Sequence, residues 1–560
     1  MKWRILPPAL PEDLSRYTDI PPLMAQCLYN RGITNPADAD LFLAADKRLN
    51  HDPSLLNEGD KAVARIMRAI HNKETIAVFG DFDADGVTAT ALLVQGLKKI
   101  GSNVIPYIPH RVDEGHGLNV PGLEKLREQG VSLVITVDCG ITGSAEVEKA
   151  QEMGLEIIIT DHHEPIGEIP KATAIIDPKL PESRYPFREL AGVGVAYKLL
   201  QALFNATGRA GQEDEFLDLV AMGTVADLVP LVDENRYLVK EGLRKLNSTS
   251  RLGINAIINC TRLELGYINT ESISYTLAPR LNATGRLDHA SVSYELLTTE
   301  SPEEAKKLAA NLETSNSERQ RLTEQFTDFA EEMLAPIGPD TPLLMASSPE
   351  FRAGVNGVVA GRLVDRYYRP AVIVEIRDNE GTGSTRSIPE FNIVSALSEC
   401  RDLLSHFGGH AQAAGFAAPN ENIETLRQRL MEIARRDLAG IELQPTINID
   451  SEVSLASLGG GIPRFIDRLE PFGRGNIPPT FLSRKVKVID SYQVGMDGDH
   501  VKFKLNDKGV VWGAIGFRLN HLNKSHPPFI DVVYNLRSNS WGGQERLELE
   551  IIDFAPSEQA

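Results

Sequence analysis

The sequence is poor in cysteine and contains no long apolar run. Only four of its 560 residues are cysteines, no two of which form a CxxC pair: Cys27, Cys139, Cys260 and Cys400. This gives no disulfide framework and fits a reducing compartment. No apolar run approaches the roughly 20 residues that span a bilayer, and Met1 to Leu14 contain no apolar signal core. We therefore expect a cytoplasmic protein that does not act on membranes.

Positive charge is also scarce. The chain has 58 Lys and Arg against 77 Asp and Glu, a formal net charge of −19. This balance argues against broad, nonspecific coating of nucleic acid, but it leaves room for a local basic groove. Residues 480–550 are less acidic than the whole, with ten Lys and Arg and eight Asp and Glu. The length is too great for one hydrophobic core, so we expect three or more domains.

Strand-like and helix-like patterns alternate in the first part of the chain. Apolar runs that suit buried strands lie at 75–79, 104–108, 131–137 and 156–160, with helical patterns at 87–100, 121–128 and 144–153. This rhythm predicts an α/β domain with a doubly wound parallel sheet. We assign it residues 51–300, where 214–300 are mainly helical. Residues 1–50 form an N-terminal extension with short helices, because Pro7, Pro8, Pro11, Pro21 and Pro22 interrupt any long pattern.

Three further segments follow. Ser301-Pro302-Glu303-Glu304 is typical of a helix start and predicts a long, polar connecting helix over 301–335. Residues 336–443 predict a second, smaller α/β domain. Residues 444–560 contain short alternating strands such as 501–505 and 547–551, which suit a small β-barrel of oligonucleotide-binding (OB) type.

Acidic residues and histidines directly follow three of the predicted strands. These segments are Asp81–Gly86 (DFDADG), Asp138-Cys139-Gly140 and Asp161-His162-His163. The C-termini of parallel strands share one edge, where ligands bind, so these side chains should meet. Carboxylates with one or two imidazoles suit Mn²⁺ or Mg²⁺, and less often Zn²⁺. Two such ions can activate a water and clamp a phosphate, so the pattern predicts a metal-dependent phosphoesterase.

The Asp81, Asp83, Asp85 alternation also has structural explanations. Asp85 alone could cap the following helix, whereas an EF-hand would need a later glutamate that is missing. Three carboxylates on one short segment repel one another unless a cation lies among them, which favours a metal site. Cys139 is interpreted as a small buried residue and not as a catalytic thiol.

The Asp161-His162-His163 triplet is the sharpest short signal. A single histidine on an apolar face is usually a core residue, but two beside an aspartate at a strand end are hard to explain structurally. One imidazole can bind metal while the next faces a phosphate. Asp227 is unremarkable on residue type alone.

The sequence resembles the DHH phosphoesterase superfamily. The three segments above and Thr224–Asp227 are similar to its four motifs, and Gly408–Gly415 (GGHAQAAG) is similar to the signature of its DHHA1-type substrate domain. Further stretches resemble the RecJ family of single-strand-specific 5′→3′ DNA exonucleases: 107–111 with 115–117, 279–287, 383–387 and the tail from Glu470. The resemblance covers nearly the whole chain, although His116 stands where a tyrosine is expected.

The resemblance implies a complete fold and mechanism. The fold is a doubly wound parallel-sheet DHH domain, a long connecting helix, a smaller DHHA1-type α/β domain and a C-terminal OB-type barrel. Two divalent ions, Mn²⁺ or Mg²⁺, would be held by Asp81, Asp83, Asp85, Asp138, His162 and Asp227. His163 would contact the scissile phosphate, which completes the catalytic set. Substrate phosphates would be bound by Arg111, Arg280, Asn282, Arg286, Ser384, Arg386 and His410.

The implied substrate is single-stranded DNA with a 5′ end, cut into mononucleotides during DNA repair and recombination. The implied partners are a single-strand-binding protein and a helicase, with the chain itself a monomer. Each arginine has the alternative role of a surface ion pair. The rival functions are a DHH phosphodiesterase for short RNA, cyclic dinucleotides or 3′-phosphoadenosine phosphate, and a noncatalytic DNA-binding scaffold.

Overall fold

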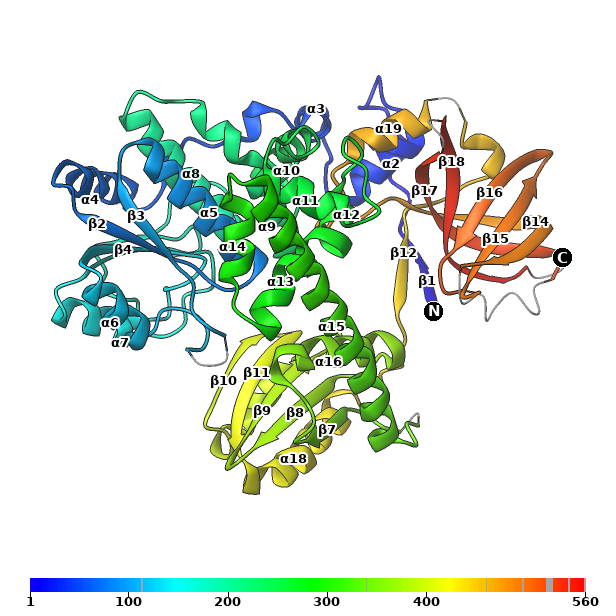
Figure 1. Cartoon of the computed structure of the whole chain (residues 1–560). Helices are drawn as coiled ribbons and strands as arrows, with labels where there is room; N and C mark the ends of the chain where they lie inside the picture. Colours follow the sequence, from blue (N-terminus) through cyan, green and yellow to red (C-terminus); the bar gives the residue numbers. More distant parts are fainter. Residues whose placement is uncertain are drawn as a thin grey trace.

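The protein is represented by a computed structural model. It describes residues 1–111, 114–338, 340–459, 461–495, 498–519, 527–541 and 544–557, without side chains over 538–546. Two α/β units and a β-barrel surround a central group of helices, and the N-terminus lies beside the barrel (Figure 1). Within the described residues, no helix is long and apolar enough to cross a bilayer.

The first unit is built on a five-stranded parallel sheet with the strand order β3-β2-β4-β5-β6. Its strands are β2 (Thr75–Phe79), β3 (Asn103–Tyr107), β4 (Val131–Val137), β5 (Glu156–Thr160) and β6 (Ala174–Ile176). Side chains alternate between the two faces of a strand, so Ile76 and Val78 enter one hydrophobic core and Ala77 and Phe79 enter another. Both faces are therefore covered, as expected for a parallel sheet.

Helices from both sides complete this unit. The first core contains side chains of α4 (Gly59–His71), α5 (Ala84–Lys99) and α8 (Gly192–Ala206); the second contains those of α6 (Val120–Glu128) and α7 (Ser144–Glu152). The predicted doubly wound parallel sheet is confirmed. The sequence pattern had not indicated β6, a short strand at the sheet edge.

A helical group joins the first unit to the second. It comprises α9 (Leu217–Ala226), α10 (Asp233–Leu246), α11 (Leu252–Asn259), α12 (Thr270–Ser272), a π-helical turn η4 (Ile273–Leu277), α13 (Ala278–Leu287), α14 (Ser291–Thr298) and α15 (Pro302–Leu334). The hydroxyl of Ser301 caps α15 by accepting a hydrogen bond from the Glu304 amide at 3.3 Å. The predicted long helix is therefore present. It packs on α11, α13 and α14 near its start and on α16 further along.

The second unit has a mostly antiparallel sheet with the order β10-β11-β9-β8-β7, in which only the β7–β8 pair is parallel. Its strands are β7 (Leu344–Ser348), β8 (Ala371–Arg377), β9 (Glu380–Arg386), β10 (His406–His410) and β11 (Ala413–Pro419). Its helices are α16 (Ala353–Tyr367), α17 (Ile393–Glu399) and α18 (Ile423–Asp437). One face shares a core with α15 and α16, and the other with α17 and α18.

The C-terminal unit is a closed barrel. Its long strands are β14 (Thr480–Val494), β15 (His500–Asp507), β16 (Val510–Gly516), β17 (Phe529–Trp541) and β18 (Gln544–Pro556). The order is β14-β15-β16-β18-β17, and pairing of β17 with β14 closes the sheet. The predicted OB-type barrel is confirmed.

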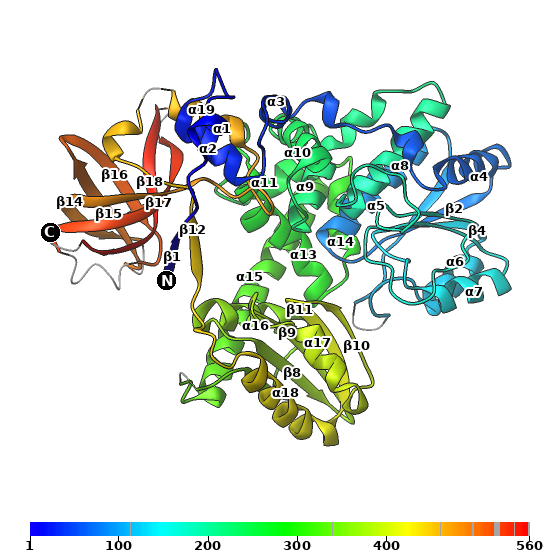
Figure 2. The same cartoon turned by 180° about the vertical axis from the view of Figure 1, so that it is seen from behind.

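The N-terminal segment packs with this barrel and not with the sheet that follows it in sequence. Strand β1 (Lys2–Ile5) pairs in parallel with β12 (Thr446–Ile449), as both views show (Figures 1 and 2). Helices α2 (Pro22–Asn30) and α3 (Pro36–Ala44) share a hydrophobic core with the barrel and α19 (Ile462–Leu469). The chain therefore leaves the barrel, builds both α/β units and returns to it.

Candidate metal centre and substrate-binding residues

The carboxyl edge of the parallel sheet gathers the acidic and histidine residues that the sequence predicted to meet. Three sets of residues each have their ligand atoms within 4.8 Å of one another. The sets are Asp81, Asp83 and Asp138; Asp85, His162 and Asp227; and Asp138, His162 and His163. These residues follow β2, β4, β5 and α9. All seven predicted metal-binding and catalytic side chains thus lie in one cluster, here called the acidic centre.

The segment after β2 uses its aspartates in different ways. The Asp83 side chain, and not that of Asp85, caps α5 by accepting hydrogen bonds from the Asp85 and Gly86 amides at 2.9 and 3.1 Å. Asp85 is buried and accepts hydrogen bonds from the Gly192 and Val193 amides at the start of α8. The helix therefore begins at Ala84, three residues earlier than the apolar pattern indicated. Glycine is needed at 86, since an added Cβ would lie 2.6 Å from the Asp81 carbonyl oxygen.

Asp138 has an unusual backbone conformation. Asp138 has a φ of 61°, a left-handed conformation that costs free energy for most residues but less for aspartate. It faces the first residue of α8, where a Cβ on Gly192 would lie 2.6 Å from that of Asp138. The left-handed turn and this glycine allow α8 and the Asp138 carboxylate to approach the same point.

The two histidines differ in their surroundings. His162 Nε2 lies 3.0 Å from Asp138 Oδ1 and 3.7 Å from Asp227 Oδ2. Burial and the nearby charge of His163 lower the pKa of His162 to about 3, so its imidazole is neutral. Burial opposes the charge on His163, but the hydrogen bond and charge of Asp161 outweigh it and raise the pKa of His163 to about 9.

Asp161 is the residue that holds this pair. Its Oδ1 lies 2.7 Å from His163 Nδ1 and accepts hydrogen bonds from the His162 and His163 amides, while its Oδ2 accepts one from Ile141. These donors and the charges of both histidines hold the pKa of Asp161 well below its usual range, although burial opposes this. A cationic His163 with a fixed ring suits contact with a phosphate.

The donor set of the acidic centre fits divalent cations. Burial and mutual repulsion of the carboxylates raise the pKa of Asp83, and raise those of Asp85 and Asp138 well above their usual range. The same two causes raise the pKa of Asp227 to about 7. His162 Nε2 is buried, and its 3.0 Å approach to Asp138 Oδ1 does not have hydrogen-bond geometry. Carboxylates that form no ion pair with Lys or Arg among the described residues, grouped around a neutral imidazole, are the expected environment for Mn²⁺ or Mg²⁺.

Arginines from both α/β units lie beside this centre. Arg111, after β3, stacks its guanidinium 4.8 Å from the ring centre of Phe82, and the charges of Asp81 and Asp83 act on it. Burial and the charges of Arg111, Arg319 and Arg386 lower the pKa of Arg286 to about 9. Among the described residues, Arg111, Arg286 and Arg386, here called the arginine group, form no ion pair with a carboxylate. Three half-buried cations without an ion pair indicate a site for an anion.

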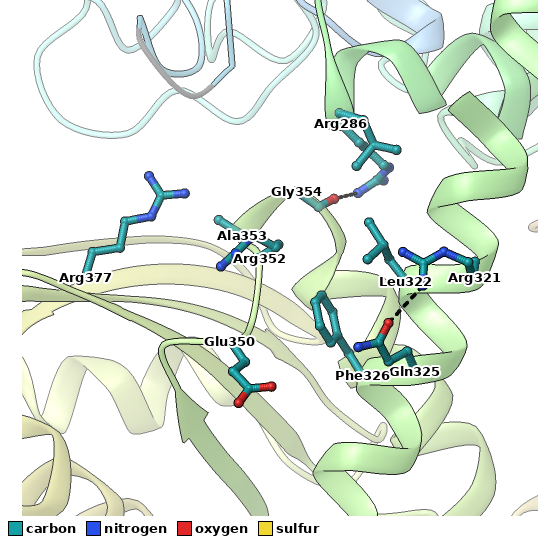
Figure 3. Close-up of a pocket in the computed structure, with 11 residues that line it drawn as sticks. Arg286, Arg321, Leu322, Gln325, Phe326, Glu350, Arg352, Ala353, Gly354 and Arg377 are labelled. Carbon is teal, nitrogen blue, oxygen red and sulfur yellow. Dashed lines mark hydrogen bonds between the residues drawn. The ribbon is translucent and has the colours of Figure 1, made fainter. Parts of the chain in front are cut away.

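Arg286 joins the first unit to the second. Its Nη1 donates a hydrogen bond to the Gly354 carbonyl oxygen at 3.0 Å, at the start of α16 (Figure 3). The cavity of about 470 Å³ drawn there also contains Arg352 and Arg377, but Arg377 donates to Glu375 and Arg352 to backbone carbonyls. Neither of these two arginines therefore adds unpaired positive charge to the arginine group.

The other predicted substrate residues are placed differently. Arg280 donates to Glu313 Oε2 at 2.6 Å, so of the two arginines on α13 only Arg286 lies in the unpaired group. Asn282 Oδ1 accepts a hydrogen bond from the Ala84 amide and so holds the start of α5. Ser384 lies two residues before Arg386 on β9 and shares its face. His410, at the end of β10, is exposed, and the charge of His163 contributes to lowering its pKa.

Several residues near the centre were not predicted as site residues. Asp177 directly follows β6, the strand that the pattern missed, and its Oδ2 is buried without a partner among the described residues. Lys179 lies two residues further on, and Arg474 arrives from the segment before the barrel. The strand-then-aspartate pattern of Ile175-Ile176-Asp177 could have identified the first of these. His116, the departure noted above, places Nδ1 3.0 Å from Asp81 Oδ1.

Comparisons with known proteins agree with this arrangement. Residues 75–224 match the family model of the DHH family N-terminal domain, 340–436 that of the DHHA1 domain, and 449–553 that of the RecJ OB domain. The chain is 39% identical to the single-stranded-DNA-specific exonuclease RecJ of Bacillus subtilis, an alignment that covers 100% of this chain and 71% of that protein.

Two solved structures are similar over the whole chain. The crystal structure of RecJ from Thermus thermophilus in complex with Mn²⁺ superimposes with a TM-score of 0.84 at 30% identity, covering 100% of this chain and 80% of that one. The corresponding structure with Mg²⁺ gives a TM-score of 0.78 at 29% identity, covering 100% and 79%. Both ions belong to the class that the acidic centre fits.

Proposed function

Since this chain belongs to the RecJ family of single-stranded-DNA-specific exonucleases, we propose that it degrades single-stranded DNA from the 5′ end and releases mononucleotides. The observation that carries the proposal is the group of three arginines without acidic partners among the described residues, of which Arg111 stacks on Phe82, between Asp81 and Asp83 of the acidic centre. An anion-binding group at a fixed distance from a metal site can hold a terminal phosphate while the next phosphodiester is cut.

The acidic centre supplies the ligands for two divalent ions, Mn²⁺ or Mg²⁺. The residues assigned to hold them are Asp83, Asp85, Asp138, His162 and Asp227, with Asp81 as a further ligand. When bound, such ions neutralise charge on a phosphate and lower the pKa of a water. The cationic His163, held by Asp161, donates a hydrogen bond to an oxygen of the scissile phosphate.

The arginines supply the end recognition. Guanidinium groups match phosphate oxygens in geometry and charge. These three come from the loop after β3, from α13 and from β9, so both α/β units must be in place to form the group. A terminal phosphate carries more negative charge than an internal phosphodiester, which favours binding of a strand end at this point. Ser384, on the same face of β9 as Arg386, adds a hydroxyl.

The two rival functions account for less of the molecule. A phosphodiesterase for short oligonucleotides or cyclic dinucleotides has no need of the barrel at 449–553, which matches the RecJ OB domain. A noncatalytic scaffold has no need of carboxylates buried at the cost of mutual repulsion. Participation in DNA repair and recombination, partnership with a single-strand-binding protein and a helicase, a monomeric state and a cytoplasmic location belong to the proposal as predictions from the sequence.

The direction of degradation provides the test. One 5′-phosphorylated single strand is labelled at its 5′ end in one sample and at its 3′ end in another, and both are incubated with the protein and Mn²⁺. We expect early release of the 5′ label as a mononucleotide, while the 3′ label shortens stepwise through long intermediates. Early loss of the 3′ label, or internal cuts seen with both labels, would contradict the proposal. A blunt duplex of the same sequence serves as the control and should be degraded slowly.

A further inference from the structure

We infer that Lys179, His410 and Arg474 form a second phosphate-binding group on the Asp227 side of the acidic centre, which holds the phosphodiester on the 3′ side of the scissile bond. The inference rests on the proposed function and extends it from the strand end to the retained strand. The three residues come from the first unit, the second unit and the segment leading into the barrel. The name 3′-side group is used for them below.

Arg474 is delivered by a tight turn that packs on the first unit. The Leu231 amide donates a hydrogen bond to the Arg474 carbonyl oxygen at 2.7 Å, and Arg474 Nη1 donates to the Leu228 carbonyl oxygen at 3.3 Å. Leu228 is the residue after Asp227. The turn needs glycine on both sides, because a Cβ on Gly473 would lie 2.6 Å from Leu231 and one on Gly475 3.0 Å from Pro230. The guanidinium is exposed and is held within reach of Asp227.

Lys179 approaches the same point from the sheet. It follows β6, and its backbone amide is fixed by a hydrogen bond to Asp177 Oδ1 at 2.8 Å. Its side chain is 14% exposed, and its described acidic partner is the largely exposed Glu164, at 3.8 Å. The charges of Lys179 and Arg474, with that of His163, oppose the burial and repulsion that raise the pKa of Asp227. Lys179 thus lies just past the end of β6, and Arg474 contacts Leu228, the residue next to Asp227.

His410 closes the group from the second unit. It ends β10, after Gly408 and Gly409, and it is exposed. Burial lowers its pKa, and so do the charges of His163, Lys179 and Arg474, while that of Glu164 opposes them. Three segments far apart in sequence thus carry the side chains of this group.

The two basic groups lie beside different members of the acidic centre. In the arginine group, Arg111 stacks on Phe82, the residue between Asp81 and Asp83. In the 3′-side group, Arg474 contacts Leu228, next to Asp227, and Lys179 follows β6, the neighbour of the strand that leads to His162 and His163. A strand whose 5′-terminal phosphate binds the arginines and whose first phosphodiester lies over the acidic centre must therefore continue towards Lys179 and Arg474. The next group of that strand able to meet a cation is its second phosphodiester.

The test removes the charge from each partner of this contact in turn. The substrate is a 5′-phosphorylated single-stranded hexanucleotide, either unmodified or with an uncharged methylphosphonate at the second internucleotide linkage. Single-turnover release of the first mononucleotide is measured with Mn²⁺ for the wild type and for Arg474→Gln. We expect Arg474→Gln to lower kcat/KM about tenfold on the unmodified strand, the size of a charge-assisted hydrogen bond, and the methylphosphonate to lower the wild type by a similar factor.

The rate of Arg474→Gln on the methylphosphonate strand shows whether Arg474 contacts that phosphodiester. If Arg474 binds that phosphodiester, the variant on the modified strand loses little beyond either single change, because the interaction is already absent. Losses that multiply, or an Arg474→Gln rate equal to the wild type, would overturn the inference. Lys179→Gln repeats the cycle with a side chain from another element, so misfolding of one variant cannot decide the result.

Matched controls separate this result from other causes. Arg464→Gln removes the same charge from an exposed arginine on α19, and it should leave all rates unchanged. Failure of the wild type to release the 5′ nucleotide from the unmodified strand would refute the proposed function and this inference with it. A wild type that is active together with multiplicative losses would refute the inference alone.

Discussion

The parallel sheet of the first unit and the mostly antiparallel sheet of the second arrange their polar residues differently. In the first, every strand runs the same way, so residues that follow β2, β4, β5 and β6 all arrive at one edge. In the second, the strands β8 to β11 alternate in direction, and substrate-binding candidates come from both a strand face, with Arg386, and a hairpin, with His410. One sheet concentrates negative charge at a point, and the other contributes an arginine from a strand face and a histidine from a hairpin.

This difference assigns distinct chemistry to the two units. Ions need several oxygen and nitrogen ligands at one point, which a parallel edge supplies without long side chains. A strand of DNA needs contacts spaced along its length, which a face and a hairpin supply. The first unit should therefore govern the chemical step, whereas changes in the second should act on substrate binding and on the identity of the strand end.

The largest effect is expected at the acidic centre. Asp138→Asn preserves the volume of the side chain but removes a charge that two of the three ligand sets share. We expect DNA hydrolysis to fall by on the order of 10³-fold or more, because a preorganised charge at the reacting phosphate is lost. Single-turnover hydrolysis in saturating Mn²⁺ measures the loss, and circular dichroism checks the fold. A rate within tenfold of the wild type would exclude Asp138 from the metal site.

Asp138→Asn should also change the stability of the metal-free protein. A carboxyl group whose folded pKa is raised destabilises the fold as pH rises from its unfolded pKa through its folded pKa, and burial with neighbouring carboxylates raises that of Asp138. Asp138→Asn should therefore increase the melting temperature in EDTA at neutral pH, while Mn²⁺ should stabilise the wild type more than the variant. An equal response of both proteins to Mn²⁺ would mean that the carboxylate does not bind the ion.

The next effect concerns the second sheet. Arg386 has no acidic partner among the described residues, and it packs beside Gly357 of α16, where an added Cβ would lie 3.1 Å from Nη2. Arg386→Gln should lower kcat/KM on 5′-phosphorylated strands by about 10- to 100-fold, as expected for a lost charge-assisted hydrogen bond. Strands with a 5′-hydroxyl should lose less.

The control for Arg386 comes from the same unit. Arg401 is exposed and lies outside the arginine group, so Arg401→Gln should retain the wild-type preference for a 5′-phosphate. Comparison of 5′-phosphate with 5′-hydroxyl strands in one experiment separates recognition of the 5′ end from general affinity for DNA. An equal loss on 5′-phosphate and 5′-hydroxyl strands would show that Arg386 binds elsewhere on the DNA.

Much of the first sheet could be predicted from the sequence, because buried parallel strands are apolar runs and residues that follow them must share an edge. The Asp138 and Asp161 segments were located by this rule, and β2, β4 and β5 have the expected bounds. The start of α5 was misplaced because Asp83 acts as its cap while Asp85 is bound by α8, a contact between residues more than 100 positions apart. Local patterns do not contain that information.

Other features depend on long-range packing throughout. Arg280 and Arg286 share one motif, and only the structure shows that Glu313 neutralises the first. Lys179 and Arg474 carry no motif of their own and gain meaning from their approach to Asp227. The pairing of β1 with β12 links residues more than 440 positions apart, so the N-terminal segment could not be assigned to the barrel core from its own sequence.

A smaller effect is expected from the residue that supports the site without binding metal. Asp161 holds His163 through Nδ1 and both backbone amides of the histidine pair. Asp161→Asn should lower kcat by about tenfold, the lower end of the range for residues that orient a metal site, with a smaller change in KM. In the metal-free protein, NMR titration should show the His163 pKa falling from about 9. An unchanged His163 pKa would show that Asp161 is only structural.

The smallest effect is expected in the barrel, where the aromatic residues divide into two classes. Phe503 is 3% exposed and packs in the core, whereas Phe517 is 41% exposed, lies against His500, and contacts Arg537. Arg537 also pairs with Glu271 of α12, so Phe517 lies on the side of the barrel near that helix. Because stacking of one base contributes roughly 1–3 kcal/mol, Phe517→Ala should weaken binding to long single strands about fivefold or more. Hydrolysis of trinucleotides should barely change, since they end before the barrel.

The control for Phe517 comes from the same barrel. Phe529 is similarly exposed, at 49%, and has no described contact with α12, so Phe529→Ala is the matched control. If both variants weaken long-strand binding equally, the barrel binds DNA without a defined path to the first sheet. If Phe517→Ala also slows trinucleotide hydrolysis, the barrel takes part in the catalytic unit, and the roles of barrel and first sheet are not separate.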